Sequence, residues 1–166
     1  MHPCRPETRP ARQDGIAMRL LPPGRHGAAT LARGDRIDCG SMTVTAEMID
    51  AFADMTGDRF EIHMSDEAAR RHGFDARVAH GLLVLSLIDG LKNRAPAQFR
   101  ARASLDWHWS FHRPVLAGDR IAVTITIAAI ERARQENQAV LTLDFDVTNQ
   151  HGESVQSGTN RLLAYR

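Results

Sequence analysis

Apolar and polar residues alternate regularly in the C-terminal half of the chain. In residues 105–111, leucine, tryptophan and phenylalanine alternate with aspartate, histidine and serine, and the same period of two recurs in residues 121–128 and 141–147. Because successive side chains of a strand point to opposite faces, this alternation predicts three strands with one buried face. A weaker strand is expected over about 154–163. Together these strands predict an antiparallel sheet that is covered on one side.

The N-terminal half of the chain has helical patterns and helix-ending signals. A short strand is expected near residues 36–41, followed by a helix that Thr45 caps and Gly57 ends. Ser65 can cap a second, shorter helix. Residues 82–91, LLVLSLIDGL, are apolar around nearly the whole helical circumference, which predicts a helix buried on all sides. An antiparallel sheet wrapped around this helix is an α+β architecture.

Composition limits the possible classes of protein. A chain of 166 residues suits one domain, and a net charge of +1 gives no general attraction to nucleic acid. No run approaches the roughly 18 apolar residues that span a bilayer. Two cysteines, Cys4 and Cys39, make no disulfide framework or metal cluster, so a cytoplasmic protein is expected. The arginine- and proline-rich residues 1–30 are expected to form a flexible or loosely docked extension, and residues 31–166 the domain.

Residues 56–81 contain the candidate chemistry. Asp58 lies five residues before His63, on the connection between two predicted helices. Along one helix this spacing would point the two side chains about 140° apart, whereas on a turn they can converge. His80 and Gly81 then begin the apolar helix, where unpaired amides meet the positive end of the helix dipole. An aspartate–histidine pair facing such amides is suited to acid–base chemistry next to a carbonyl group.

Three segments carry a family likeness. They read FADMTGDRFEIHMSDEAARRHGF, VAHGLLVLSLIDGL and FHRPVLAGDRI. Over about residues 35–164 the chain resembles the MaoC-type dehydratases, the (R)-specific enoyl-CoA hydratase group with the hot-dog fold. The family pattern in the first segment is Asp-x-Asn-Pro-x-His. Asp58 and His63 keep this spacing, but Phe60 and Glu61 replace the asparagine and proline, so the loop must be held differently or the acyl pocket widened.

The resemblance implies a fold and an activity. It implies a single hot-dog domain that adds or removes water across the C2=C3 bond of an enoyl-CoA or 3-hydroxyacyl-CoA thioester. Asp58 and His63 would be the acid–base pair, and the backbone amide of Gly81 would bind the thioester oxygen. No metal or organic cofactor is implied, since coenzyme A enters as part of the substrate. The resemblance also implies a homodimer or a dimer of dimers, with sites at the subunit interface.

Four further residues are candidates for substrate binding: Phe60, His80, Ser86 and Asp89. Asp89 is the least certain, because a carboxylate on a buried helix is costly unless it is paired. It is expected to bond an arginine or histidine, to orient the site water, or to face a subunit interface.

Two other functions are compatible with the same residues. A hot-dog acyl-CoA thioesterase would use a carboxylate to activate water against the carbonyl carbon. Alternatively, the changed Phe60-Glu61 loop could have lost the chemistry, which would leave a non-catalytic protein that binds acyl-CoA or a partner subunit.

Overall fold

The computed structural model describes residues 18–166. Five antiparallel strands form one sheet in the order β2-β5-β6-β7-β4, and a pair of short parallel strands, β1 and β3, lies beside it. The elements are β1 (Gly24–His26), the 3-10 turn η1 (Ala28–Thr30), β2 (Arg36–Thr43), α1 (Ala46–Thr56), α2 (Glu61–Met64), α3 (Asp66–Arg71), α4 (Gly81–Arg94), β3 (Ala97–Phe99), β4 (Ala101–Phe111), β5 (Arg120–Arg132), β6 (Gln138–Thr148) and β7 (Ser154–Tyr165).

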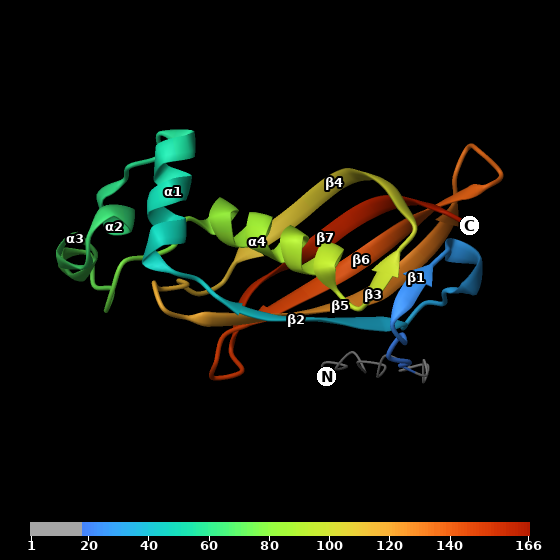
Figure 1. The fold of residues 1–166 in the computed structure, drawn as a ribbon, viewed down its shortest axis with the longest axis horizontal. Coiled ribbons are helices and arrows are strands. Elements are labelled where there is room, and N and C mark those ends of the chain that lie inside the picture. The colour runs from blue at the N-terminus through green and yellow to red at the C-terminus, as the bar shows by residue number, and fades with distance from the viewer. Residues whose placement is uncertain (1–17) are drawn as a thin grey trace, which may run out of the picture.

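The sheet has the one-sided burial that its sequence pattern predicts. In β5, Ile121, Val123 and Ile125 are almost fully buried, while the residues between them remain partly exposed. The sheet curves around α4, which lies along its inner face (Figure 1). The predicted α+β architecture, with an antiparallel sheet around a long helix, is therefore confirmed.

The expectation that this helix is buried on all sides is wrong. One side of α4 packs into the core through Leu83, Val84 and Ile88, but Leu82 is 62% exposed and Ser86 is also exposed. The reason is that one five-stranded sheet covers only one side of a helix. Apolar side chains around the whole circumference of α4 predicted full burial. No other described element of the chain covers the side that carries Leu82 and Ser86.

Helices α1, α2 and α3 gather at the end of the molecule where α4 begins (Figure 1). Their predicted caps are confirmed. The side chain of Thr45 accepts a hydrogen bond from the Met48 amide, and that of Ser65 accepts one from the Ala68 amide. Gly57 ends α1 with a left-handed φ of 77°, a conformation that glycine adopts without steric cost. Local sequence signals at Gly57 and Ser65 therefore fix the two ends of the segment between α1 and α3.

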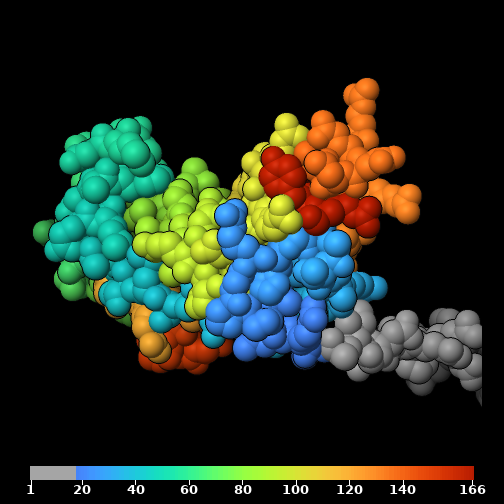
Figure 2. Space-filling model, turned by 45° about the vertical axis from the view of Figure 1, so that its right-hand side comes forward, coloured from blue at the N-terminus to red at the C-terminus, as the bar shows by residue number. Residues whose placement is uncertain are grey.

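The chain packs onto the domain from residue 18 onward. Leu21 and Ala28 are buried in the core, and β1 pairs in parallel with β3. Figure 2 shows this N-terminal segment lying against the end of α4 and the residues that follow it. The expected extension spanned residues 1–30; its first 17 residues lie outside the described part. Residues 18–30 are part of the domain because β1 pairs with β3, which lies far along the sequence. No local sequence pattern predicts this pairing.

Within residues 18–166, no helix combines the length and the apolar character needed to cross a bilayer.

Candidate active site

His63 lies on α2, a helix of one turn, and not on an open loop as expected. Its ring Nδ1 lies 2.6 Å from the carbonyl oxygen of Val78, and the Val78 amide donates back to the carbonyl of Ile62. Because a carbonyl oxygen can only accept, Nδ1 must carry the hydrogen of the neutral ring. The lone pair of Nε2 is therefore available to another group.

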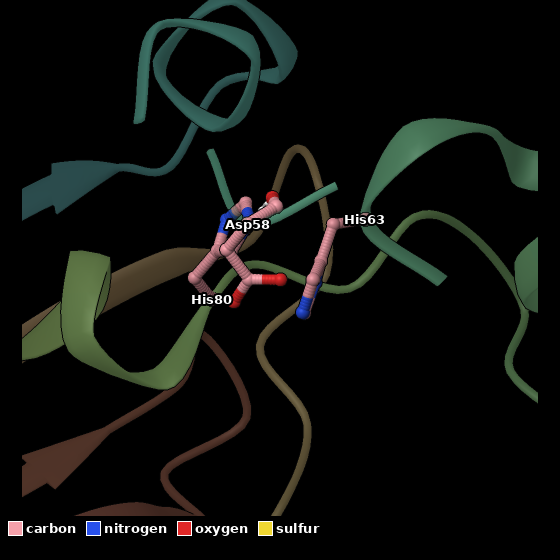
Figure 3. Close-up of side chains that lie close together, drawn as sticks. All are labelled: Asp58, His63 and His80. Atoms are coloured by element: carbon pink, nitrogen blue, oxygen red, sulfur yellow. Dashed lines mark hydrogen bonds between the residues drawn. The ribbon is translucent and has the colours of Figure 1, made fainter. Parts of the chain in front are cut away.

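Asp58 lies on the connection between α1 and α2. Its amide donates to the hydroxyl of Thr56, and one carboxylate oxygen accepts from the amide of Phe60 at 3.3 Å. A carboxylate oxygen of Asp58 and a ring nitrogen of His63 lie within 4.8 Å of each other, and Figure 3 shows the carboxylate turned toward the imidazole. No direct hydrogen bond joins the two side chains in the described structure, and one water molecule can bridge a gap of this size.

His80, the residue before α4, touches both members of this pair. Its ring stacks on that of His63, with 3.8 Å between centroids and 27° between planes. Its Nε2 lies 2.9 Å from the carbonyl oxygen of Asp58, so Nε2 carries the hydrogen. The ring is 3% exposed, and its Nδ1 has no hydrogen-bond partner among the described residues. The three side chains form one packed group (Figure 3).

The same three residues approach one another closely enough to raise the question of a metal site. An imidazole binds zinc through a lone pair in the plane of its ring, at about 2.0–2.1 Å. Two nearly parallel rings at 3.8 Å cannot direct both lone pairs at one ion unless a ring rotates. Rotation would break the hydrogen bond from His63 to Val78 or that from His80 to Asp58. The donor set therefore fits a common metal ion poorly.

The surroundings of His63 keep its ring neutral. Burial lowers the pKa of His63 most strongly, and the nearby charge of His80 lowers it further. The hydrogen bond to Val78 and the charge of Asp58 act in the opposite direction, but the net pKa lies below the ordinary value of 6.5. At neutral pH the ring is therefore a proton acceptor.

A largely apolar pocket of about 440 Å³ opens beside His63. It lies between the start of α4, the segment before it and the end of β4, and Asp58 adjoins it by way of His63. The residues that line it are His63, Phe74, Val78, Ala79, Gly81, Leu82, Phe111, His112, Arg113, Pro114, Val115 and Gln156.

Gly81 lies in the wall of this pocket. As the first residue of α4 it has no partner for its amide within the helix, and no other acceptor for that amide occurs in residues 18–166. The ring of Phe111 packs directly over it, so that an added Cβ would lie 2.6 Å from a ring carbon. A glycine is needed here for close approach.

None of the four candidates for substrate binding lines this pocket. His80 is behind His63, and Phe60 is 55% exposed, with its ring edge toward His63. Ser86 donates to the carbonyl of Leu82 within α4. Asp89 lies on the open side of α4, where it pairs with no arginine or histidine of residues 18–166.

The partner of Asp89 is Lys92, one turn further along the helix, at 2.5 Å. The Lys92 side chain is only 6% exposed, and its ammonium lies 5.3 Å from the ring centre of Trp107. The ion pair with Lys92 thus offsets the free-energy cost of removing the Asp89 carboxylate from water. A lysine partner was not predicted from the sequence.

Glu61 stands where the family pattern has a proline, and its side chain contacts Arg71 of α3 and His72 at the end of that helix. Its two carboxylate oxygens lie 2.7 Å from Nε2 of His72 and 3.1 Å from the guanidinium of Arg71. These contacts tie α2 to α3 and lower the pKa of Glu61, the bond from His72 contributing most. Phe60 packs near the same histidine, 6.0 Å between ring centres. The loop is therefore held differently, as expected.

Several pocket residues were missed from the sequence. Phe111, His112 and Arg113 belong to the segment FHRPVLAGDRI, and neither its likeness to a family nor the strand pattern that includes Phe111 showed that the three meet in one pocket. Gln156 comes from β7 and accepts a hydrogen bond from the indole of Trp109. Its place in the site depends on the pairing of β4 with β7, which no local signal gives.

The chain is similar to known proteins in sequence and in fold. The chain is 31% identical over 100 residues to the 3-hydroxybutyryl-CoA dehydratase of Methylorubrum extorquens, covering 60% of this chain and 62% of that protein. A crystal structure of a MaoC-like dehydratase from Rhodospirillum rubrum superposes with a TM-score of 0.74 and 28% identity, over 85% of this chain and 97% of that one.

The fold itself matches more widely. A Mycobacterium tuberculosis protein described as a double hot-dog fold superposes with a TM-score of 0.73 at 17% identity, over 84% of this chain and 44% of that one. The chain thus has the hot-dog fold. Residues 30–149 match the sequence profile described as the MaoC like domain. This match includes the catalytic candidates, the central helix and most of the sheet, and the chain therefore belongs to the MaoC-like domain family.

Proposed function

We propose that this protein adds water to, or removes it from, the C2=C3 bond of an acyl-CoA thioester. The observation that carries the proposal is that His63 and Gly81 line one pocket while a carboxylate oxygen of Asp58 lies within 4.8 Å of a ring nitrogen of His63. The named relative that dehydrates a 3-hydroxyacyl-CoA supports the choice of substrate. The aligned part spans less than two thirds of that relative's length, so the activity of this chain is inferred mainly from its own site.

Hydration would begin with a water molecule held between Asp58 and His63. The Nε2 lone pair of His63 and the carboxylate of Asp58 both accept hydrogen bonds, so the pair can orient the water and take its proton. The hydroxide adds to C3 and a proton is delivered to C2; dehydration is the reverse. Asp58 and His63 are both candidates for the acid and for the base, and neither role is assigned to one residue.

The Gly81 amide is suited to the thioester oxygen. Negative charge develops on that oxygen when C3 is attacked, and a free N–H at the positive end of α4 stabilises it. Such oxyanion donors commonly lower a barrier by about 3 kcal/mol. The apolar pocket walls suit an acyl chain, and this chemistry requires no metal or organic cofactor.

We propose that the protein acts as a homodimer or as a dimer of dimers. Strand β4 is an unpaired edge of the sheet, and most of its residues are exposed, including Leu105 and Phe111. Leu82 on the open side of α4 is also exposed, close to the pocket. A second copy could cover both the edge and the helix, and an uncovered edge strand of this kind is otherwise prone to aggregation.

The reaction is tested with crotonyl-CoA. We expect the alkene absorbance to fall while the thiol stays masked, and Asp58→Asn to lower kcat by at least about 100-fold because it removes a proton acceptor. Asp75→Asn is the matched control, since Asp75 is exposed and outside the pocket. Release of free thiol would indicate a thioesterase instead. Binding of the ligand without turnover would indicate a non-catalytic protein.

A further inference from the structure

We propose that His80 is a positioning residue that holds His63 and Asp58 in their working arrangement. The inference rests on the proposed hydratase function, because it assigns a role within that site. His80 is not among the pocket-lining residues, so it is not expected to touch substrate.

The first contact is with the backbone that carries Asp58. Asp58 follows a helix-ending glycine on an exposed connection, and the hydrogen bonds near its carboxylate come only from neighbouring residues. The bond from Nε2 of His80 to the Asp58 carbonyl, at 2.9 Å, instead joins this connection to the start of α4 across 22 residues of sequence. Since α4 is anchored in the core, this bond fixes the height of Asp58 above the helix start.

The second contact is the ring stack with His63. The carbonyl of Val78 fixes one nitrogen of His63 but leaves its ring free to rock about that bond. A buried ring at 3.8 Å against one face removes this freedom and so fixes the plane of the His63 ring, in which the Nε2 lone pair lies. Phe52 packs against His80 at 5.0 Å and holds the second ring in turn.

The stack also restricts protonation. A proton on both rings would place two positive charges at van der Waals separation in a buried site, which is strongly unfavourable. The other charged or titratable groups facing His63 are the carboxylate of Asp58 and, across the pocket, His112 and Arg113. The lowered pKa of His63, caused first by burial and then by His80, agrees with a ring kept ready to accept.

Two substitutions separate the two contacts. His80→Phe keeps an aromatic ring in the stack but removes the hydrogen bond to Asp58. His80→Gln keeps an amide donor but removes the stacked ring. We expect kcat to fall by about 10- to 100-fold in each, with less than about a twofold change in KM, since a misplacement near 1 Å can cost 100-fold. His151→Phe, in an exposed turn, is the matched control and should retain wild-type kcat.

A second readout does not depend on turnover. The pKa of His63 is followed by NMR from its ring proton, assigned with a His63→Gln variant. We expect it to rise toward 6.5 in both His80 variants, because the neighbouring charge is gone. This rise reports the loss of the neighbouring charge, whereas a merely structural role would lower the melting temperature and leave the kcat of the folded variants at the wild-type value.

The outcomes are distinguishable. Wild-type kcat in either His80 variant overturns the proposal, because each removes one of the two contacts, and so does an unchanged His63 titration in both. If the wild type hydrates no enoyl thioester but the His63 pKa rises in both variants, the proposed function fails, the positioning role fails with it, and only the close approach of the two rings is supported.

Discussion

At the scale of single residues, the neutral state of His63 is the property on which the chemistry depends. Its hydrogen bond to Val78 fixes the tautomer, and burial lowers its pKa below 6.5. We therefore expect kcat/KM to be constant above about pH 6.5 and to fall on acidification, as the ring loses its lone pair to a proton. A pH–rate profile with crotonyl-CoA checks this, and a kcat/KM that rises on acidification, or that already falls above pH 6.5, would contradict it.

The same pKa shift makes stability depend on pH. The unfolded chain binds the His63 proton more readily than the folded one, because the folded pKa is the lower of the two. The free energy of unfolding should therefore decrease as pH falls from about 6.5 through the folded pKa, and level off below it. Urea unfolding of the wild type and His63→Gln at pH 7.5 and 5.5 measures this. The decrease should be smaller in the variant.

Gly81 provides a second residue-scale prediction. In Gly81→Ala the new Cβ would lie 2.6 Å from the ring of Phe111, so the ring must swing outward or the helix start must shift. We expect kcat to fall about 10- to 100-fold, as for other misplacements in a site. Because Phe111 is 56% exposed, the melting temperature should change little. Adding Phe111→Leu should restore part of the rate, whereas no rescue would indicate that the helix start itself has moved.

At the scale of elements, α2 is too short to be stable alone, since an isolated helical turn is unfavourable in water. Contacts with the rest of the protein must therefore stabilise α2. The contacts of Glu61 with Arg71 and His72 join it to α3. The exposed position of these groups makes them weak as sources of global stability. Their effect should therefore be local, on the orientation of His63.

Glu61→Gln tests this element. It weakens both contacts, and we expect kcat to fall by up to about 10-fold, less than the 100-fold that a full 1 Å displacement can cost. The melting temperature should change little. Glu67→Gln is the control, because it removes a different partner of Arg71 and leaves the link between α2 and α3 in place. Equal losses of activity in the two variants would show that the link has no specific role.

At the scale of the whole molecule, the proposed assembly depends on the uncovered edge of the sheet and the uncovered side of α4. Leu105 is 49% exposed on β4, and in a two-fold symmetric dimer through this strand each copy would contribute it. We expect the wild type to sediment as a dimer or larger, and Leu105→Glu as a monomer with reduced activity. Met55→Glu, on exposed α1, is the matched control. A monomeric wild type at micromolar concentration would contradict the proposed assembly.

Much of the fold could be predicted from the sequence, because its signals are local. Alternation placed β4 to β7, and Thr45, Gly57 and Ser65 placed the ends of the helices. The convergence of Asp58 and His63 was predicted from a turn, and it occurs although His63 lies on the short helix α2. Strand β1 was missed because it depends on β3, more than 70 residues later, and not on a pattern of its own.

The sequence by itself determined the class of fold, the helix start at Gly81 and the approach of Asp58 to His63, since periodicity, caps and short spacings act within a few residues. Only the tertiary structure decided what surrounds them: the stack of His80 on His63, the ring of Phe111 over Gly81 and the lysine that pairs with Asp89. These contacts depend on how whole segments pack together. Their distances are set by the shared core and not by any neighbouring residue.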